Sequence, residues 1–386
     1  MTAELPLPQG FRAHVTNIGI KDDTDDFVII AADRPCTTSA VFTRSSFAGP
    51  SVVVSREHAA DRSARAVVVI SKNANVATGD DGLANAREVV AGVAASLGIA
   101  PTEVLIASTG VIGRQYPMER VRAGLTAIPA SLPGTDGAAV ARGIMTTDTV
   151  PKTASASVGA ARVVGVAKGV GMIEPDMATL ITLFFTDAAI DADALDDVFR
   201  RVIDRTFNCV SVDTDTSTSD TAIILASGAA GAVAADAFET ALHDVALSLT
   251  QQVARDGEGA EKLIEVDVRG AADDAQAKRI AKSIVNSPLV KTAVHGADPS
   301  WGRVAMAIGK ASTVEEIDQS RVQIAFGAQE VYPARVDESG LDALAQYMRG
   351  DTVRICVDLH AGTGSSTVWG CDLTDGYVRI NADYTT

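Results

Sequence analysis

Apolar residues recur along the chain with the spacing of amphipathic helices. The clearest case is the segment 191–207, where apolar side chains follow one another at intervals of three and four residues and Asp191 stands at the position of an N-cap. The segments 236–255, 83–97 and 273–283 show the same spacing. We therefore predict a helix over each of these segments, with one apolar face packed against a core.

Short apolar runs rich in β-branched residues alternate with these helices. Residues 66–71 and 103–108 are predicted to be buried strands, because each run is bounded by polar or glycine residues. The segment 133–137 and the Ser/Ala/Gly-rich segment 154–161 are predicted loops, and neither is long enough to link two domains. The alternation favours an α/β fold of mixed α and β layers, without a domain boundary visible in the sequence.

Composition and charge exclude several classes of protein. The chain of 386 residues is long enough for two lobes or one large layered domain, and its net charge of −16 argues against a partner with a phosphate backbone, such as nucleic acid. Its longest apolar runs, 66–70 and 180–185, are far too short to cross a membrane. The first twelve residues lack the pattern of a signal peptide, so we expect a cytoplasmic protein. The four cysteines and five histidines are dispersed, so we expect reduced thiols and no metal.

The segment from Lys168 to Thr179 is the most informative for chemistry. A glycine-rich loop with a single lysine leads to Thr179 at the start of an apolar strand, which would place the hydroxyl at a strand edge as a candidate nucleophile. The order of a phosphate-binding loop is absent, and Glu174 stands where a dinucleotide-binding fingerprint needs glycine. On composition alone, an ordinary strand residue is the favoured interpretation of Thr179, because threonine is common in strands.

Four further segments carry candidate groups. Thr109 and Gly110 follow a predicted strand, so the Thr109 side chain and the N–H of Gly110 could stabilise an oxyanion, although a plain turn has the same sequence. The runs 146–149 and 213–221 are dense in short hydrogen-bonding side chains, which are also typical of solvated loops. Glu258 lies between two glycines, where it could present a carboxylate to an amine or belong to a surface turn.

These segments belong to a longer series of motifs along the chain, namely 72–75 (KNAN), 108–113, 145–149, 168–179, 207–208, 213–221, 256–259, 286–292, 298–303 and 381–386. In this order, the series resembles the ornithine acetyltransferases, also called glutamate N-acetyltransferases, over nearly the whole chain. The resemblance implies β-sheets layered between helices, a fold shared with certain self-processing aminopeptidases and distinct in topology from the N-terminal nucleophile hydrolases.

The resemblance also implies self-cleavage of the bond between Ala178 and Thr179. The Thr179 hydroxyl would attack the preceding carbonyl, and hydrolysis of the resulting ester would give the chains 1–178 and 179–386. The two chains would stay associated, with two copies of each in the assembly. The new α-amino group has a pKa near 8 by its type, so it can accept the hydroxyl proton without a histidine.

The implied reaction moves an acetyl group from N2-acetylornithine to glutamate through an acetyl-Thr179 intermediate. Thr109 and Gly110 would form the oxyanion hole, and no cofactor or metal is required. By motif, the substrate contacts fall on Thr146, Lys168, Thr179, Glu258, Asn381 and Thr386. We expect Lys168 to suit a substrate carboxylate and Glu258 an ammonium group, with the choice between Thr146 and Thr147 left open.

Four positions depart from the usual family pattern, and they are Glu174, Asp176, His295 and Ser300. These departures are similar to a branch associated with clavulanic-acid-type biosynthesis, so the pathway served can be arginine or secondary-metabolite synthesis. Two alternatives compete with the transferase. One is a self-processing amidase or aminopeptidase, in which water discharges the acyl-enzyme. The other is an uncleaved, catalytically silent protein that binds a metabolite.

Overall fold

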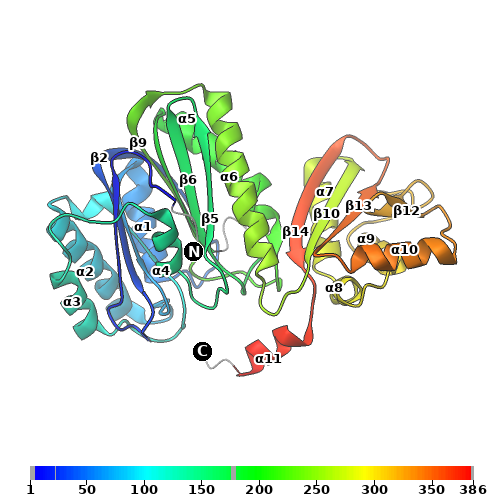
Figure 1. The fold of residues 1–386 in the computed structure, drawn as a ribbon, viewed down its shortest axis with the longest axis horizontal. Helices are drawn as coiled ribbons and strands as arrows, with labels where there is room; N and C mark the ends of the chain where they lie inside the picture. The colour runs from blue at the N-terminus through cyan, green and yellow to red at the C-terminus, as the bar shows by residue number, and fades with distance from the viewer. Residues whose placement is uncertain (1–4, 22, 175–179, 384–386) are drawn as a thin grey trace.

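Two β-sheets organise the chain into a larger and a smaller lobe (Figure 1). The structure is a computed structural model, and it describes residues 5–21, 23–174 and 180–383. Helix α6 (Ala235–Arg255) lies between the two sheets and packs against strands of both. Within the described ranges, no helix is long and apolar enough to span a membrane.

The larger sheet has eight strands in the order β4-β3-β2-β9-β7-β6-β5, with β1 paired beside β2. Neighbouring strands run antiparallel except for the parallel pairs β3/β4 and β7/β9. The strands are β1 (Phe11–Thr16), β2 (Phe27–Phe42), β3 (Ser63–Ile70), β4 (Val104–Ser108), β5 (Lys152–Val158), β6 (Ala161–Lys168), β7 (Ile181–Ala189) and β9 (Thr221–Ala232).

Helices cover both faces of this sheet, because successive side chains of a strand point to opposite faces. In β7, Leu183 and Phe185 belong to the core beneath α4, whereas Phe184 packs against Phe199 of α5 with ring centroids 5.8 Å apart. The helices of this lobe are α1 (Pro50–His58), α2 (Gly79–Leu97), α3 (Met118–Thr126), α4 (Gly137–Gly143) and α5 (Ala192–Arg205), with 3-10 turns at Ala59–Asp61, Pro101–Glu103 and Phe207–Cys209.

The smaller sheet has six strands in the order β12-β11-β13-β10-β14-β8. Its strands are β8 (Val210–Ser211), β10 (Leu263–Ala271), β11 (Gln323–Phe326), β12 (Gln329–Tyr332), β13 (Thr352–Asp358) and β14 (Gly364–Cys371). Its helices are α7 (Asp274–Val285), α8 (Pro288–His295), α9 (Trp301–Lys310), α10 (Glu338–Met348) and α11 (Asp375–Asp383). One apolar cluster runs from Phe184 in the larger sheet to Ile264 and Val266 in the smaller, so the lobes share a core.

Most of the elements predicted from periodicity are confirmed. The predicted helices correspond to α2, α5, α6 and α7, and Asp191 caps α5 by accepting a hydrogen bond of 2.9 Å from the N–H of Asp193. The predicted strands correspond to β3 and β4, and the mixed α/β layering is also confirmed.

The loop predicted over 154–161 is wrong. These residues form most of β5 and the turn into β6, with Gly159 at a positive φ of 58° in the turn. The small alanine and serine side chains of β5 lack the bulk that usually marks a strand. They nevertheless pair along their whole length with the apolar strand β6, which supplies the packing.

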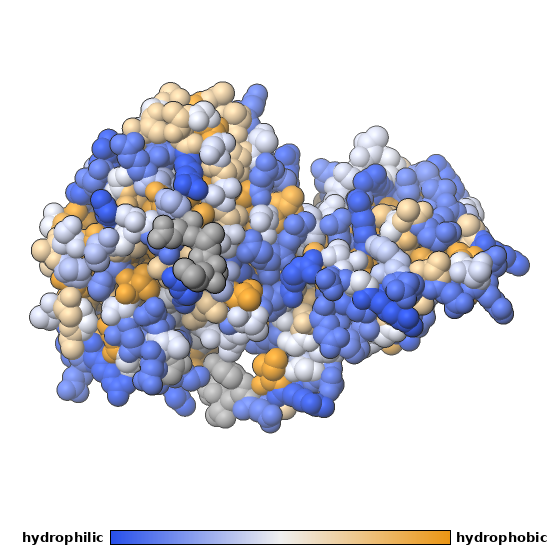
Figure 2. All heavy atoms as spheres, in the orientation of Figure 1, coloured by the Kyte–Doolittle hydropathy of each residue, from blue (hydrophilic) through white to orange (hydrophobic). Residues whose placement is uncertain are grey.

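Figure 2 shows that hydrophilic residues dominate the visible face of the smaller lobe, while apolar residues form small separate groups on the larger lobe. Helix α11 extends away from the smaller lobe and back toward the larger one (Figure 1). This return brings a residue near the end of the described chain, Asn381, to the candidate site described next.

Candidate active site

The candidate site is a cleft at the ends of three neighbouring strands. Lys168, the last residue of β6, pairs with Ile181, the first residue of β7, and Ile181 pairs with Thr221, the first residue of β9. This register places Lys168, Leu180 and Asp220 at the same end of the sheet. All three line the cleft, together with Thr109, Gly110, Thr146, Thr147, Gly171, Glu258 and Asn381.

The turn after β4 brings Thr109 and Gly110 into this cleft. The N–H of Thr109 donates to the carbonyl of Ile70 at 3.1 Å, so this N–H is already used. Gly110 has a φ of 127°, and a Cβ at this position would lie 2.2 Å from the carbonyl carbon of Lys72, so only glycine fits. Among the described residues, the N–H of Gly110 has no acceptor. The turn can therefore offer this N–H and the Thr109 hydroxyl to an oxyanion.

Lys168 connects this turn to the glycine-rich loop. Its ammonium nitrogen Nζ donates to the Thr109 hydroxyl oxygen at 3.3 Å, and its side chain is buried. Burial lowers the pKa of Lys168, while the nearby carboxylate of Asp148 opposes this shift. The buried lysine thus presents its amino nitrogen at the wall of the cleft, beside the Thr109 hydroxyl.

A buried ion network behind the cleft holds three of its loops. Lys152 donates to Asp148 Oδ1 at 2.7 Å and to Asp256 Oδ2 at 2.6 Å, and the side chains of Lys152 and Asp148 are fully buried. Asp148 also accepts hydrogen bonds from the N–H of Gly169 at 2.7 Å and from the N–H of Thr146 at 3.1 Å. The network therefore fixes the Thr146 loop, the glycine-rich loop and the turn that precedes Glu258.

The sequence pattern singled out the runs that contain Asp148 and Asp256, but it did not single out Lys152 or predict the network. Burial raises the pKa of Asp148, but the ammonium groups of Lys168 and Lys152 outweigh burial, so the pKa lies below its ordinary value. The spacing of four residues between Asp148 and Lys152 was a weak local signal. Asp256 lies 104 residues from Lys152, so no local pattern could have joined them.

Glu258 faces the cleft from the loop after α6. Its Oε1 accepts from the Thr147 hydroxyl at 3.2 Å, and its Oε2 accepts from the Asn381 amide at 2.9 Å. A Cβ on Gly171 would lie 2.5 Å from Oε2, which explains a glycine at this point of the loop. Both Thr146 and Thr147 line the cleft, but the hydroxyl that contacts Glu258 is that of Thr147.

Asp220 is a lining residue that sequence reasoning placed in the polar run 213–221 but did not single out. It is 1% exposed, and the hydrogen-bonding groups nearest its carboxyl are the Ser217 side chain and the N–H groups of Ser217 and Leu180. Burial raises the pKa of Asp220 well above its ordinary value, and the charge of Lys168 only partly opposes this shift. The cleft therefore contains a carboxyl group whose pKa is raised by burial.

Three predicted site residues, Ala178, Thr179 and Thr386, lie outside the described residues, as does the departure Asp176. The described residues on either side of segment 175–179 are anchored. The N–H groups of Met172 and Ile173 donate to Asp213 at 2.7 and 2.8 Å, and the carbonyl of Leu180 accepts from the N–H of Thr221 at 2.9 Å. The described residues that flank the predicted nucleophile are therefore held in place beside the cleft.

The other departures from the family pattern lie away from the cleft lining. The Glu174 carboxylate accepts from the Ser211 hydroxyl at 3.1 Å and from the Asn286 amide, so it joins the smaller lobe. Ser300 precedes α9 as its N-cap residue, without a capping side-chain bond. His295 lies in a cluster with Glu261 and Asp372, the only group among the described residues whose donor atoms could hold a metal ion.

The cleft unites a Thr-Gly turn, a buried lysine and a half-buried glutamate beside the start of β7, and no histidine lines it among the described residues. These features suit the binding of a small substrate that carries charged groups. The sequence pattern of the ArgJ family matches residues 12–386, so the chain belongs to the ArgJ family. The predicted resemblance to the ornithine acetyltransferases is thereby confirmed.

Individual relatives agree with this assignment. The chain is 60% identical to glutamate N-acetyltransferase Oat2 of Streptomyces clavuligerus, over 98% of each chain. It is 52% identical to the arginine biosynthesis bifunctional protein ArgJ of Rhodococcoides fascians, over 98% of this chain and 94% of that one. A solved ArgJ structure from Bacillus halodurans is 43% identical and covers 51% of this chain and 96% of its own, with a TM-score of 0.48.

Proposed function

We propose that this protein is a glutamate N-acetyltransferase, which transfers the acetyl group of N2-acetylornithine to glutamate. The observation that carries the proposal is the meeting of Thr109, Gly110, Lys168 and Glu258 in one cleft, at the start of β7. The cleft has a cation for a carboxylate and a carboxylate for an ammonium group, which are the charged groups of an amino acid. The whole-chain similarity to a glutamate N-acetyltransferase supports the same reaction.

The proposed enzyme first cleaves itself between Ala178 and Thr179. The chains 1–178 and 179–386 would remain together because strands of the downstream chain lie between strands of the upstream chain in the larger sheet. Strands β9 and β7 come from the downstream chain and lie between β2 and β6 of the upstream chain. Separating the chains would break two strand pairings and expose the apolar faces of the sheet. We propose an assembly of two upstream and two downstream chains.

The transfer then proceeds in two half-reactions. The α-amino group of Thr179 accepts the proton of its own hydroxyl, and the oxygen attacks the acetyl carbonyl of acetylornithine. The N–H of Gly110 and the hydroxyl of Thr109 stabilise the tetrahedral oxyanion, and ornithine leaves with the proton on its amine. The amine of glutamate attacks the acetyl ester in the second half-reaction, which restores the Thr179 hydroxyl and releases N-acetylglutamate.

The remaining cleft residues hold the substrates. Lys168 binds a carboxylate and Glu258 an ammonium group, while Thr146, Asn381 and Thr386 complete the substrate contacts. The bond from the Asn381 amide to Glu258 supports a joint role of these two side chains. The bond between Thr147 and Glu258 makes Thr147 a positioning residue for that carboxylate.

Intact mass spectrometry of the denatured protein tests self-cleavage. The wild-type protein should give two fragments of 178 and 208 residues, whereas Thr179→Ala should give one species of 39.9 kDa. An uncut wild-type chain would overturn the mechanism, because the proposed base would not exist.

An acetyl-transfer assay with and without glutamate then separates the transferase from the self-processing amidase. We expect N-acetylglutamate to form from acetylornithine only when glutamate is present. Release of free acetate at the same rate without glutamate would show that water is the acceptor and would refute the transferase.

A further inference from the structure

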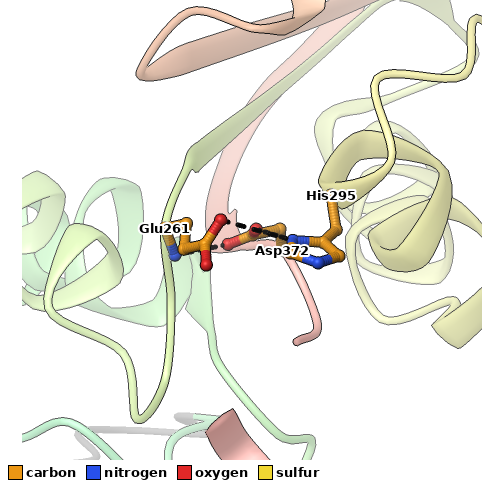
Figure 3. A group of neighbouring side chains, drawn as sticks. All are labelled: Glu261, His295 and Asp372. Carbon is orange, nitrogen blue, oxygen red and sulfur yellow. Dashed lines mark hydrogen bonds and ion pairs between the residues drawn. The ribbon is translucent and has the colours of Figure 1, made fainter. Parts of the chain in front are cut away.

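A histidine and two carboxylates converge outside the cleft, on the smaller lobe (Figure 3). Glu261 precedes β10, His295 ends α8, and Asp372 directly follows β14. The His295 Nδ1 atom lies 3.2 Å from Asp372 Oδ2 and 3.6 Å from Glu261 Oε2. The three donor atoms all lie within 4.8 Å of one another, and none of these residues lines the cleft.

The surrounding hydrogen bonds hold this arrangement in place. Asp372 Oδ1 accepts from the N–H groups of Glu261 and Lys262, both at 2.9 Å, which leaves Oδ2 to face His295. The ammonium group of Lys262 donates to the carbonyls of Val294 at 2.8 Å and His295 at 3.0 Å, so it fixes the end of α8. Such outer contacts orient ligands before an ion arrives.

The charges of the cluster favour a cation. A neutral imidazole has one N–H, and Nδ1 can satisfy only one of the two carboxylates that face it. The cluster also lies at the C-terminal end of α8, where the helix dipole favours positive charge. The Asp372 side chain is fully buried, whereas that of Glu261 is 64% exposed, so one side of the cluster is open to water.

We propose that Glu261, His295 and Asp372 bind a divalent transition-metal ion, with water completing the coordination. Zn²⁺ fits best, because imidazole nitrogen and carboxylate oxygen bind it at about 2.0–2.2 Å. In a tetrahedral site, such bonds place neighbouring donor atoms roughly 3.3 Å apart. The observed separations of 3.2 and 3.6 Å from Nδ1 lie on either side of that value.

The position of the site gives the ion a structural role. Glu261 lies three residues after Glu258, and Asp372 begins the connection to α11, which carries Asn381. The two connections already touch, since the Thr374 hydroxyl donates to the carbonyl of Gly259 at 2.6 Å. A bound ion would cross-link the two segments that bring Glu258 and Asn381 to the cleft. This inference does not depend on the proposed acetyl transfer.

Metal titration of the tag-free, metal-stripped protein tests the site. Equilibrium dialysis against Zn²⁺ with elemental analysis should give one ion per copy of residues 1–386 in the wild-type protein. His295→Asn and Glu261→Gln should each weaken binding at least tenfold. His360→Asn is the matched control, because His360 Nδ1 faces only one carboxylate, that of Asp358 at 3.5 Å, and its affinity should be unchanged.

Co²⁺ absorption identifies the ligands. The chain has four free cysteines, which could bind metal as thiolates. We expect visible Co²⁺ bands without the near-ultraviolet band of thiolate ligands. Three results would each overturn the proposal. They are strong thiolate absorption, unchanged affinity in both folded variants, and no saturable binding up to about 1 mM Zn²⁺, which is roughly the weakest affinity of specific cation sites in proteins. Glu261→Gln keeps the test valid if His295→Asn fails to fold, because the Glu261 side chain is largely exposed.

Discussion

Removing the cation at the centre of the buried ion network should strongly destabilise the fold. In Lys152→Met, the carboxylates of Asp148 and Asp256 would remain in place without the ammonium group that lies 2.7 and 2.6 Å from them. Methionine keeps much of the length and volume of lysine, so lost packing contributes little. The variant therefore isolates the cost of leaving two carboxylates without their shared cation.

The magnitude follows from the burial of the network. Removing one partner of a buried ion pair costs about 3–5 kcal/mol. Because two carboxylates lose their shared cation, the loss of stability should lie in the upper part of this range. Asp148 limits the loss, because it keeps the hydrogen bonds from Gly169 and Thr146 and the nearby charge of Lys168. We expect a loss of about 4 kcal/mol, which is roughly a thousandfold change in the unfolding equilibrium.

Urea unfolding at neutral pH measures this loss. The experiment uses a Thr179→Ala background, so that the chain stays in one piece and can refold. Lys278→Met is the control, because its partner Asp204 is 65% exposed, and it should lose no more than about 1 kcal/mol.

The triple variant Lys152→Met/Asp148→Asn/Asp256→Asn should recover part of the stability, because no carboxylate is then stranded. A loss below about 1 kcal/mol for Lys152→Met alone, or a triple variant less stable than the single one, would refute the reasoning.

Three further predictions concern the cleft. Gly110→Ala should lower kcat for acetyl transfer by about 10²–10³-fold, because it displaces an oxyanion donor. Gly79→Ala is the control: Gly79 has a φ of 65° and no atom within 4 Å of an added Cβ, so kcat should stay within about threefold. Comparable losses of kcat in steady-state assays of both variants would contradict this prediction. Burial lowers the pKa of Lys168 below its ordinary value of 10.5, so the KM for acetylornithine should begin to rise with pH before pH 10.5 is reached. In Lys168→Arg the KM should not rise in this range, because arginine keeps its charge. Identical profiles of KM against pH for both proteins would count against this prediction. Because burial raises the pKa of Asp220 above 3.8, its contribution to stability is greatest below that pH and falls as pH rises toward the folded-state pKa. Calorimetry should therefore find the Tm of Asp220→Asn, relative to wild type, higher at pH 8 than at pH 4, and the opposite order would exclude a neutral Asp220.

The sequence was sufficient where the signal is local. Helix α5 was predictable because its apolar residues and its cap fall within one segment, and Thr109 and Lys168 stood out because glycines adjoin them. Strand β5 was missed because alanine and serine side chains have weak strand preference, and its pairing with β6 decides its structure. The layering of sheets between helices came from the resemblance, but the strand order of the larger sheet was not predicted at all, since no spacing in the chain encodes which strands are neighbours.

The functional contacts that escaped prediction are long-range. Asp256 reaches Lys152 across 104 residues, and Asp372 reaches His295 across 77. Each of these residues looks like an ordinary surface polar group in the sequence, because burial of an acid becomes visible only when its partners are in place. The buried carboxyl of Asp220 escaped prediction for the same reason.

The position of β7 and β9 between upstream strands of the larger sheet has a consequence for the order of folding and cleavage. While the chain is continuous, β7 and β9 find their places between β6 and β2 by closing loops within one molecule, at a cost that does not depend on concentration. After the proposed cut, the same step becomes an encounter between two molecules. On this proposal, folding precedes cleavage, and the cleaved protein, once unfolded, should regain its structure slowly and in proportion to its concentration. Its persistence is then set by the rate of unfolding rather than by an equilibrium.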